Sequence, residues 1–366
     1  AVENEFYRVT LDEGGGVGSI YDKSADRELI DQDHANAFGS LIVRDIDGKE
    51  YHSRAVGKAS VSRDGLSVRV VVRQAVHGHP LIEQVLTLTS KSPCIEFGVG
   101  VLKDPTPNLE VAVAFPFDVE GGTYQIEEPL HVTDPAEDRL PGVFSNRLVP
   151  QDWVLVRNRL SGVLWSSLDA PSMSIGQYWP NRVSPAHCVA PAVTLHLPPQ
   201  EPEELTGGTI YSCICYNNMM TNFSVNQSGH LYFRYVFRSC STRAGIEEAQ
   251  AFGDAAHRPF SAIMTKHPGV RTLGPAQAYL EIENPALRLI TLKEAEDGDG
   301  MILRLWNPTD KSIETNIQLP SHAIASVEIS NVVEGSTGEA IRSEGSSLAV
   351  SVGPDVVRTL RIHVEM

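Results

Sequence analysis

Apolar and polar residues alternate with a period of two along nearly the whole chain, and this pattern limits the fold more than any other. The clearest examples are residues 61–75, 81–89, 94–102 and 109–117. Because the side chains of a strand point alternately to its two faces, the pattern predicts strands with one buried face. Turn-forming clusters separate the segments, which favours successive antiparallel strands. We therefore predict an all-β protein with a large antiparallel β-sandwich.

The first residues predict a β-hairpin. Residues 6–11 alternate in polarity, Gly14, Gly15 and Gly16 follow, and residues 17–21 alternate again. Glycine adopts positive φ angles without steric cost, so all three glycines are expected to supply the tight reversal. Because the chain enters this hairpin directly, with no initiator Met and no leader, we expect it to be part of a longer protein.

Helical periodicity is scarce, and only residues 246–256 predict a short helix. Pro and Gly in residues 252–275 predict a linker. Beyond it the alternation restarts, and about seven short strands in residues 278–364 are typical of a small Ig-like sandwich. We predict a large β-sandwich over residues 1–262 and a small C-terminal one over residues 263–366.

The composition excludes several classes of partner. The chain has 30 Lys and Arg against 46 Asp and Glu, a formal net charge of −16. Nucleic acids and anionic membranes need clustered basic residues, and no apolar run approaches the roughly 18 residues of a membrane span. Five irregularly spaced cysteines predict free thiols in a reducing, cytoplasmic compartment. Alternation is expected to place Cys213 and Cys215 on the same face of a strand.

Two segments, near residues 165–171 and 216–235, place Asp, Asn and Arg beside aromatic residues at strand ends. Sugar sites are built in this way, because aromatic faces stack on the sugar ring while polar side chains bind its hydroxyls. The alternative is a structural role for these residues. In that case Asp169 and Asn222 cap turns, and Trp165 and Phe223 belong to the core.

A hydrolytic site would need two facing carboxylates. The candidates are Asp118, Asp152 and Asp169, and nothing in their spacing brings two of them together. His77 and His79 share a strand face, but a zinc site needs three or four ligands, so a solvated strand end is expected there. The chain has no HExxH motif, no glycine-rich phosphate loop and no GxSxG elbow.

Six short motifs follow one another along the chain. They are residues 2–23, Phe115-Pro-Phe117, Ser166-Ser-Leu-Asp-Ala-Pro171, Thr221-Asn-Phe223, Ala295-Glu-Asp-Gly298 and Leu303-Arg-Leu-Trp-Asn-Pro308. In this order they resemble the C-terminal half of glycoside hydrolase family 38, the retaining α-mannosidases, in its bacterial-type branch. The resemblance extends over essentially the whole chain. It implies a galactose-mutarotase-like β-sandwich followed by a small Ig-like sandwich.

The resemblance also implies that the catalytic residues lie elsewhere. In this family a zinc ion, the Asp that binds it and acts as nucleophile, and the general acid belong to an N-terminal α/β barrel, which this chain lacks. We therefore expect no catalytic residue, metal or cofactor in this chain, and no activity of the chain alone. Its expected role is to support the barrel and complete the sugar pocket. The expected partners are that barrel, mannosides bound by the complete enzyme, and a second copy in a homo-oligomer.

The positions of the motifs imply five substrate-binding residues. They are Asp169, Tyr216, Asn218, Asn222 and Arg234. Two other functions stay open, a free-standing carbohydrate-binding protein of the same fold and an aldose 1-epimerase-like enzyme. The epimerase would need a His and a Glu beside one sugar ring, and only His230 lies near the aromatic segments.

Overall fold

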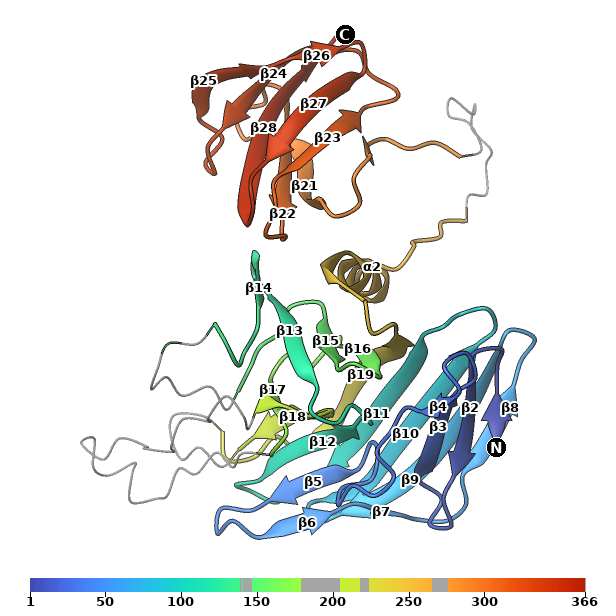
Figure 1. Cartoon of the computed structure of the whole chain (residues 1–366). Helices are drawn as coiled ribbons and strands as arrows, with labels where there is room; N and C mark the ends of the chain where they lie inside the picture. The colour runs from blue at the N-terminus through green and yellow to red at the C-terminus, as the bar shows by residue number, and fades with distance from the viewer. Residues whose placement is uncertain (139, 141–146, 179–204, 218–223, 265–275, 366) are drawn as a thin grey trace. The chain divides into compact units, whose positions relative to one another are not determined.

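Two compact β units make up the chain. The computed structural model describes residues 1–138, 140, 147–178, 205–217, 224–264 and 276–365. The larger unit comprises residues 1–128, 133–244 and 248–258, and the smaller one comprises residues 129–132, 245–247 and 259–366 (Figure 1). Antiparallel strands build both units. The predicted all-β class, with a large sandwich followed by a small one, is confirmed.

A small four-stranded sheet opens the larger unit. Its strands, in spatial order, are β1 (Val2–Glu3), β2 (Tyr7–Leu11), β3 (Val17–Asp22) and β4 (Arg27–Glu28). Tyr7 and Val9 are buried, whereas Arg8 and Thr10 are exposed. This is the alternation that the sequence predicts for the first strand of the hairpin.

The turn of the hairpin differs from the prediction. Only Gly15 has a positive φ angle, of 86°, so the same expectation for Gly14 and Gly16 was wrong. The Asp12 carboxylate closes the turn instead, because its Oδ1 accepts a hydrogen bond from the Gly16 N–H at 2.9 Å. A side chain that binds its own turn removes the need for further glycine-only angles.

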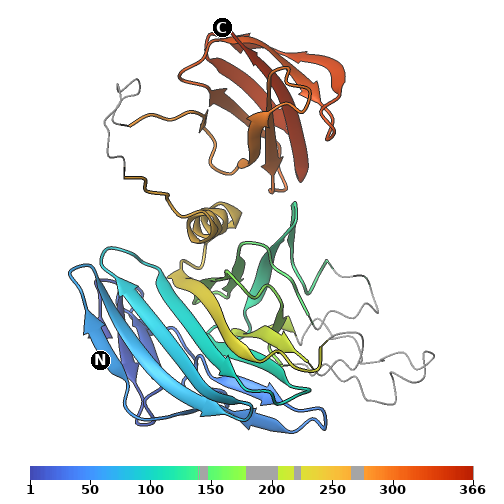
Figure 2. The same ribbon diagram turned by 180° about the vertical axis from the view of Figure 1, so that it is seen from behind.

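A ten-stranded sheet forms one layer of the large sandwich. In spatial order it contains β14 (His131–Thr133), β13 (Thr123–Glu128), β15 (Val154–Arg157), β16 (Gly162–Ser167), β19 (Gly229–Cys240), β11 (Ile95–Lys103), β10 (His79–Thr89), β9 (Ser67–Val76) and β7 (Arg54–Ala55), and β8 (Ser60–Arg63) also pairs with β9. Figure 2 shows the long central strands of this sheet side by side. The alternating segments of the sequence supply these strands.

A five-stranded sheet forms the other layer. Its order is β17 (Met173–Ile175), β18 (Thr209–Tyr216), β12 (Glu110–Pro116), β5 (Leu41–Arg44) and β6 (Glu50–His52). Aromatic rings join the layers, because Phe115 of β12 lies 5.9 Å from Phe97 of β11 and 5.6 Å from Trp165 of β16, between ring centroids. Burial of such large side chains is the main source of stability in a sandwich. Trp165 is fully buried, so it has the core role and does not stack on a sugar.

Helix α2 (Ile246–His257) packs against the large sandwich. Phe252 is buried, and Ser166 Oγ of β16 lies 2.8 Å from His257 Nε2. The predicted linker over residues 252–275 therefore started too early, because residues 252–257 complete the helix. Within the described ranges, no helix combines the length and the apolar character that crossing a membrane requires.

The smaller unit is a second sandwich with its own core. One sheet contains β20 (Glu281–Ile282), β23 (Ile313–Gln318), β27 (Ser347–Val352) and β26 (Ser343–Glu344), and the other contains β21 (Arg288–Glu294), β22 (Met301–Asn307), β28 (Val356–Val364), β24 (Ile324–Ser330) and β25 (Ser336–Ile341). Leu303, Leu305, Val350 and Leu360 lie in its core. About seven strands were predicted here, and the described residues form more. Strand β25 had no pattern to predict it, because it is exposed along most of its length and therefore shows no alternation.

Candidate functional site

The turn of residues 168–172, called the 168–172 turn below, connects the two layers of the large sandwich. It follows β16 of the ten-stranded sheet and leads into β17 of the five-stranded sheet. The Ala170 N–H donates a hydrogen bond to Ser167 Oγ at 3.1 Å, an arrangement that stabilises tight turns. Three of the predicted substrate-binding residues are in or beside this turn, namely Asp169, Tyr216 and Arg234.

Asp169 and Arg234 form a bidentate ion pair. Asp169 Oδ1 accepts a hydrogen bond from Arg234 Nη2 at 2.9 Å, and Oδ2 accepts from Nε at 2.9 Å and from the backbone N–H at 2.8 Å. Hydrogen bonding by Arg234 lowers the pKa of the Asp169 carboxyl, which is therefore ionised at neutral pH. Both carboxylate oxygens are engaged, whereas the Arg234 side chain is 56% exposed and presents further N–H donors to solvent.

Tyr216 lies on the other side of the turn, at the end of β18. Its hydroxyl is 3.0 Å from Ser172 Oγ, so the last residue of the 168–172 turn holds it. The guanidinium carbon of Arg147 lies 5.3 Å from the centroid of the Tyr216 ring, within the range of a cation–π contact. Burial raises the pKa of Tyr216, and the phenol therefore keeps its proton and can donate a hydrogen bond.

A buried ion pair beside Tyr216 was not predicted from the sequence. Glu110 is fully buried and accepts a hydrogen bond from Arg147 Nη2, while Arg147 Nη1 donates to Ser174 Oγ at 2.7 Å. Burial by itself would lower the pKa of Arg147, but neighbouring acidic groups, among them the carboxylate of Glu110, raise it, so the guanidinium stays charged. The available signal was Glu110 itself, a carboxylate in a segment that is otherwise apolar.

The carboxylates considered for hydrolysis have separate surroundings. Asp169 binds Arg234, and Asp152 Oδ2 accepts a hydrogen bond from Arg258 Nη2 at 3.0 Å. Burial, and after it the charge of Asp31, raise the pKa of Asp118. Two of the three candidate carboxylates are thus paired with arginine. A carboxylate in such a pair is better suited to hold a neighbouring group in place than to transfer a proton.

The predicted solvated strand end holds for His77, which is exposed in the turn after β9, but not for His79. His79 is buried, and its Nδ1 lies 2.9 Å from the His77 carbonyl oxygen. The His77 ring stacks on Tyr51 with 4.4 Å between centroids. Within the described ranges, no three His, Cys, Asp or Glu side chains form a group that could hold a metal ion.

The two thiols of β18 point to opposite faces, which corrects the prediction. A β-bulge pairs Cys213 with Ala112 and Cys215 with Val111, so Ile214 is an extra residue in β18. Cys215 consequently joins the core between the layers, whereas Cys213 lies near the Arg147 cluster. Both thiols are buried and free, as the composition predicted.

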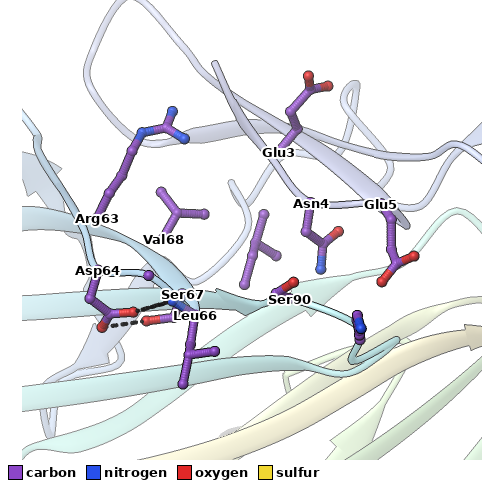
Figure 3. A pocket seen from close by; sticks show the side chains of 12 residues that line it. Glu3, Asn4, Glu5, Arg63, Asp64, Leu66, Ser67, Val68 and Ser90 are labelled. Atoms are coloured by element: carbon purple, nitrogen blue, oxygen red, sulfur yellow. Dashed lines mark hydrogen bonds between the residues drawn. The ribbon is translucent and has the colours of Figure 1, made fainter.

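Asn218, Asn222 and Phe223 lie outside the described residues. A separate pocket of about 440 Å³ lies between the start of the chain and the β8–β9 and β10–β11 turns (Figure 3). Polar side chains that line it are hydrogen-bonded to the backbone of the surrounding turns. Asp64 accepts hydrogen bonds from the N–H groups of Leu66 and Ser67, and Asn4 donates to the Thr89 carbonyl. None of the predicted site residues lines this pocket, and the 168–172 turn is the candidate site.

Two family models match the chain, one at each end. Residues 2–139 match the glycosyl hydrolases family 38 C-terminal domain, and residues 286–360 match the glycosyl hydrolases family 38 C-terminal beta sandwich domain. Most of the first match lies in the larger unit, and the second lies in the smaller one. A comparison with curated proteins found no match.

Two solved structures from Enterococcus faecalis share the fold of nearly the whole chain. An α-mannosidase from strain V583 aligns with 99% of this chain at a TM-score of 0.71 and 15% identity. A protein in glycosyl hydrolase family 38 aligns with 99% of it at a TM-score of 0.71 and 14% identity. The alignments cover 42% and 44% of those chains, so this chain spans less than half the length of either relative.

The order of the two domain matches agrees with the order of the motifs that the sequence shows. The fold of both units agrees with that of the two bacterial structures. We conclude that the chain belongs to glycosyl hydrolase family 38, as its C-terminal β region.

Proposed function

We propose that this chain is the non-catalytic part of an α-mannosidase-type glycoside hydrolase. One observation supports this most directly. Nearly all of this chain aligns with the α-mannosidase from Enterococcus faecalis V583, yet it accounts for only 42% of that protein. The remainder of such an enzyme supplies the catalytic domain. Its proposed reaction is hydrolysis of α-mannosidic bonds with retention, at a site that holds zinc.

The carboxylates of this chain support the assignment of catalysis to another domain. A retaining glycosidase places a nucleophile and a general acid about 5–5.5 Å apart across the scissile bond. Here Asp152 and Asp169 are bound by Arg258 and Arg234, and each therefore works as a fixed hydrogen-bond acceptor. Such groups can orient a sugar but are poorly suited to donate a proton to a leaving group.

The 168–172 turn is the part proposed to complete the sugar pocket. Arg234 has donors directed to solvent, and Asp169 fixes the direction of its guanidinium. Tyr216, Asn218 and Asn222 are proposed as further contacts to sugar hydroxyls. In this role the turn binds and orients the substrate, and the chain supports the catalytic domain.

The test uses the complete enzyme that contains this chain. Asp169→Asn releases Arg234 while keeping the size of the side chain, and Asn222→Ala removes a proposed contact. We expect each to raise KM for 4-nitrophenyl α-mannoside by about threefold to tenfold, the cost of one polar contact, with a smaller change in kcat. Asp64→Asn is the matched control, because it makes the same change of side chain in the β8–β9 turn, where Asp64 accepts hydrogen bonds from the N–H groups of Leu66 and Ser67.

Unchanged kcat and KM in both variants would remove the 168–172 turn from the sugar pocket. The chain expressed alone should not hydrolyse the same substrate, and measurable hydrolysis by it would contradict a non-catalytic role. Sugar binding without any active complete enzyme would instead favour a free-standing carbohydrate-binding protein.

We also propose a cytoplasmic location and assembly with the catalytic domain of the same polypeptide, and with a second copy of the enzyme. The location is supported by four cysteines that are free in the described ranges, namely Cys94, Cys213, Cys215 and Cys240. Free buried thiols are common where the surroundings are reducing. Light scattering of the complete enzyme tests the oligomer.

A further inference from the structure

One row of residues crosses the outer face of the ten-stranded sheet. Arg73 of β9 is paired with Glu83 of β10, Glu83 with Gly100 of β11, and Gly100 with Tyr232 of β19. Residues directly opposite in antiparallel strands project to the same face. The next residue of β11, Val101, is buried in the core, so this row faces away from the core. Figure 2 shows these strands side by side.

Two glycines of β11 form a trough in this face. Gly98 and Gly100 lie on the same face, and because neither has a side chain, the space above them is open to a ring from the neighbouring strand β19. A Cβ on Gly98 would collide with the Tyr232 hydroxyl, and one on Gly100 would lie 3.6 Å from Cδ2 of the same ring. The Tyr232 ring therefore lies along β11 over both glycines. A pocket of about 330 Å³ opens beside Gly100 and Tyr232, and it is lined in part by Leu81, Glu83, Leu102 and His230.

Tyr232 is unusually accessible for an aromatic residue on a strand. The residue is 57% exposed, and its hydroxyl has no hydrogen-bond partner among the described residues. An aromatic ring in water gains free energy when an apolar surface covers it, and its hydroxyl offers one donor and one acceptor. A partner that has both an apolar face and hydroxyl groups fits this combination.

The charges around the trough are balanced in pairs. Arg73 Nη2 lies 3.1 Å from Glu83 Oε2 on one side, and Arg234, opposite Gly98, binds Asp169 on the other. A trough flanked by balanced pairs attracts neither an anion nor a cation strongly. The paired groups still present lone pairs and N–H donors to a neutral ligand.

We propose that Tyr232 and the trough of Gly98 and Gly100 bind the ring of a neutral hexopyranose, and that this chain binds α-mannosides here without hydrolysing them. The apolar face of the sugar stacks on the Tyr232 ring, and its hydroxyls bind the flanking Glu83 and the Tyr232 hydroxyl. The choice of mannose among neutral sugars rests on the proposed function, whereas the stacking surface rests on the residues alone.

The experiment measures binding by this chain itself. Soluble α-mannan in affinity gel electrophoresis and methyl α-mannoside in an NMR titration are the probes. Tyr232→Ala should weaken binding of both at least about tenfold, because it removes the stacking surface. Tyr232→Phe keeps the ring and should change the affinity by less than about threefold, the loss of one hydrogen bond. Gly98→Ala should weaken binding, because the new Cβ displaces the ring.

Tyr279→Ala is the matched control, since Tyr279 is 51% exposed and belongs to the smaller unit. Its affinity for both probes should equal that of the unchanged chain. Far-UV circular dichroism of each variant establishes that the sheet is retained, and Tyr232→Phe and Gly98→Ala test the proposal even if Tyr232→Ala does not fold.

The proposal is overturned if the unchanged chain binds neither probe, or if Tyr232→Ala and Gly98→Ala bind both probes as tightly as the unchanged chain. An assay of α-mannoside hydrolysis by the complete enzyme distinguishes a failure of this proposal from a failure of the proposed function. An active enzyme whose C-terminal chain does not bind mannan contradicts only the Tyr232 site. Binding through Tyr232 in an enzyme that does not hydrolyse α-mannosides contradicts only the proposed function.

Discussion

Single residues of the candidate site act through fixed charge pairs. Asp169 uses both oxygens to hold Arg234, and Glu110 holds Arg147 beside Tyr216. Asp169 and Arg234 were each predicted from the sequence as substrate-binding residues, but their ion pair was not predicted. The two positions are 65 residues apart, and only the antiparallel order of β16 and β19 brings them together. A single sequence carries no direct signal for such a long-range contact.

The Asp169–Arg234 pair predicts a pH dependence of stability. The pKa of Asp169 is lowered from its ordinary value of 3.8, so its stabilisation is full above that value and is lost as the pH falls through the lowered pKa. Since Arg234 is more than half exposed, the pair is expected to contribute only about 0.5–1 kcal/mol. Asp169→Asn should therefore lower the free energy of unfolding in urea by this amount at about pH 7 and by much less at about pH 3.

Arg234→Met provides the control, because it removes the same pair from the other side. In the double variant the two effects should not add, since only one interaction is lost. An Asp169→Asn effect of equal size at both pH values would show that the carboxylate charge does not contribute.

At the level of elements, most strands could be predicted, because one face of each strand is buried and alternation follows from that burial. The errors arise where a local feature interrupts the pattern. The bulge at Ile214 turns Cys213 and Cys215 to opposite faces. The exposed strand β25 has no buried face to produce a pattern. Helix α2 continues past the predicted start of the linker, because packing on the sandwich stabilises its last turn.

The contact of α2 with the sandwich depends on a glycine. A Cβ at Gly253 would lie 2.8 Å from Cδ1 of Trp153 and 3.1 Å from Cβ of Asp152. Gly253→Ala should lower the free energy of unfolding by about 1–3 kcal/mol, because overpacking outweighs the helix propensity of about 1 kcal/mol that Ala gains. Thermal or urea unfolding followed by circular dichroism measures the change.

Ala255→Gly is the comparison within the same helix. Ala255 is exposed, so this variant should lose only the propensity of about 1 kcal/mol. A stabilised Gly253→Ala protein would mean that α2 does not need this close approach to Trp153.

Among the described residues, each of the two units has its own main apolar core. One lies between the sheets of the large sandwich, and the other lies inside the smaller unit. Each core is made of side chains from its own unit, so each unit has its own source of hydrophobic stabilisation. The sequence predicted two β domains because alternation stops and restarts, and composition alone could not assign residues to the two cores.

Separate cores predict two unfolding transitions in calorimetry. Leu305 is fully buried in the smaller unit, and Leu305→Ala should destabilise that unit by about 2–5 kcal/mol, which lowers one transition by roughly 10 °C or more. The other transition should stay within a few degrees. Leu86→Ala, at a buried position of the large sandwich, should show the reverse pattern. One transition that shifts as a whole in both variants would mean that the two units unfold together.

The amino-acid sequence alone determined the β class, the two-domain order and the family resemblance. These depend on local periodicity and on short motifs, which can be read along one chain. Only the tertiary structure decided which polar groups meet. It paired Asp169 with Arg234, placed the buried Glu110 opposite Tyr216 on the neighbouring strand and laid Tyr232 over Gly98. These contacts depend on strand order and register in three dimensions, and residues far apart in the sequence create them.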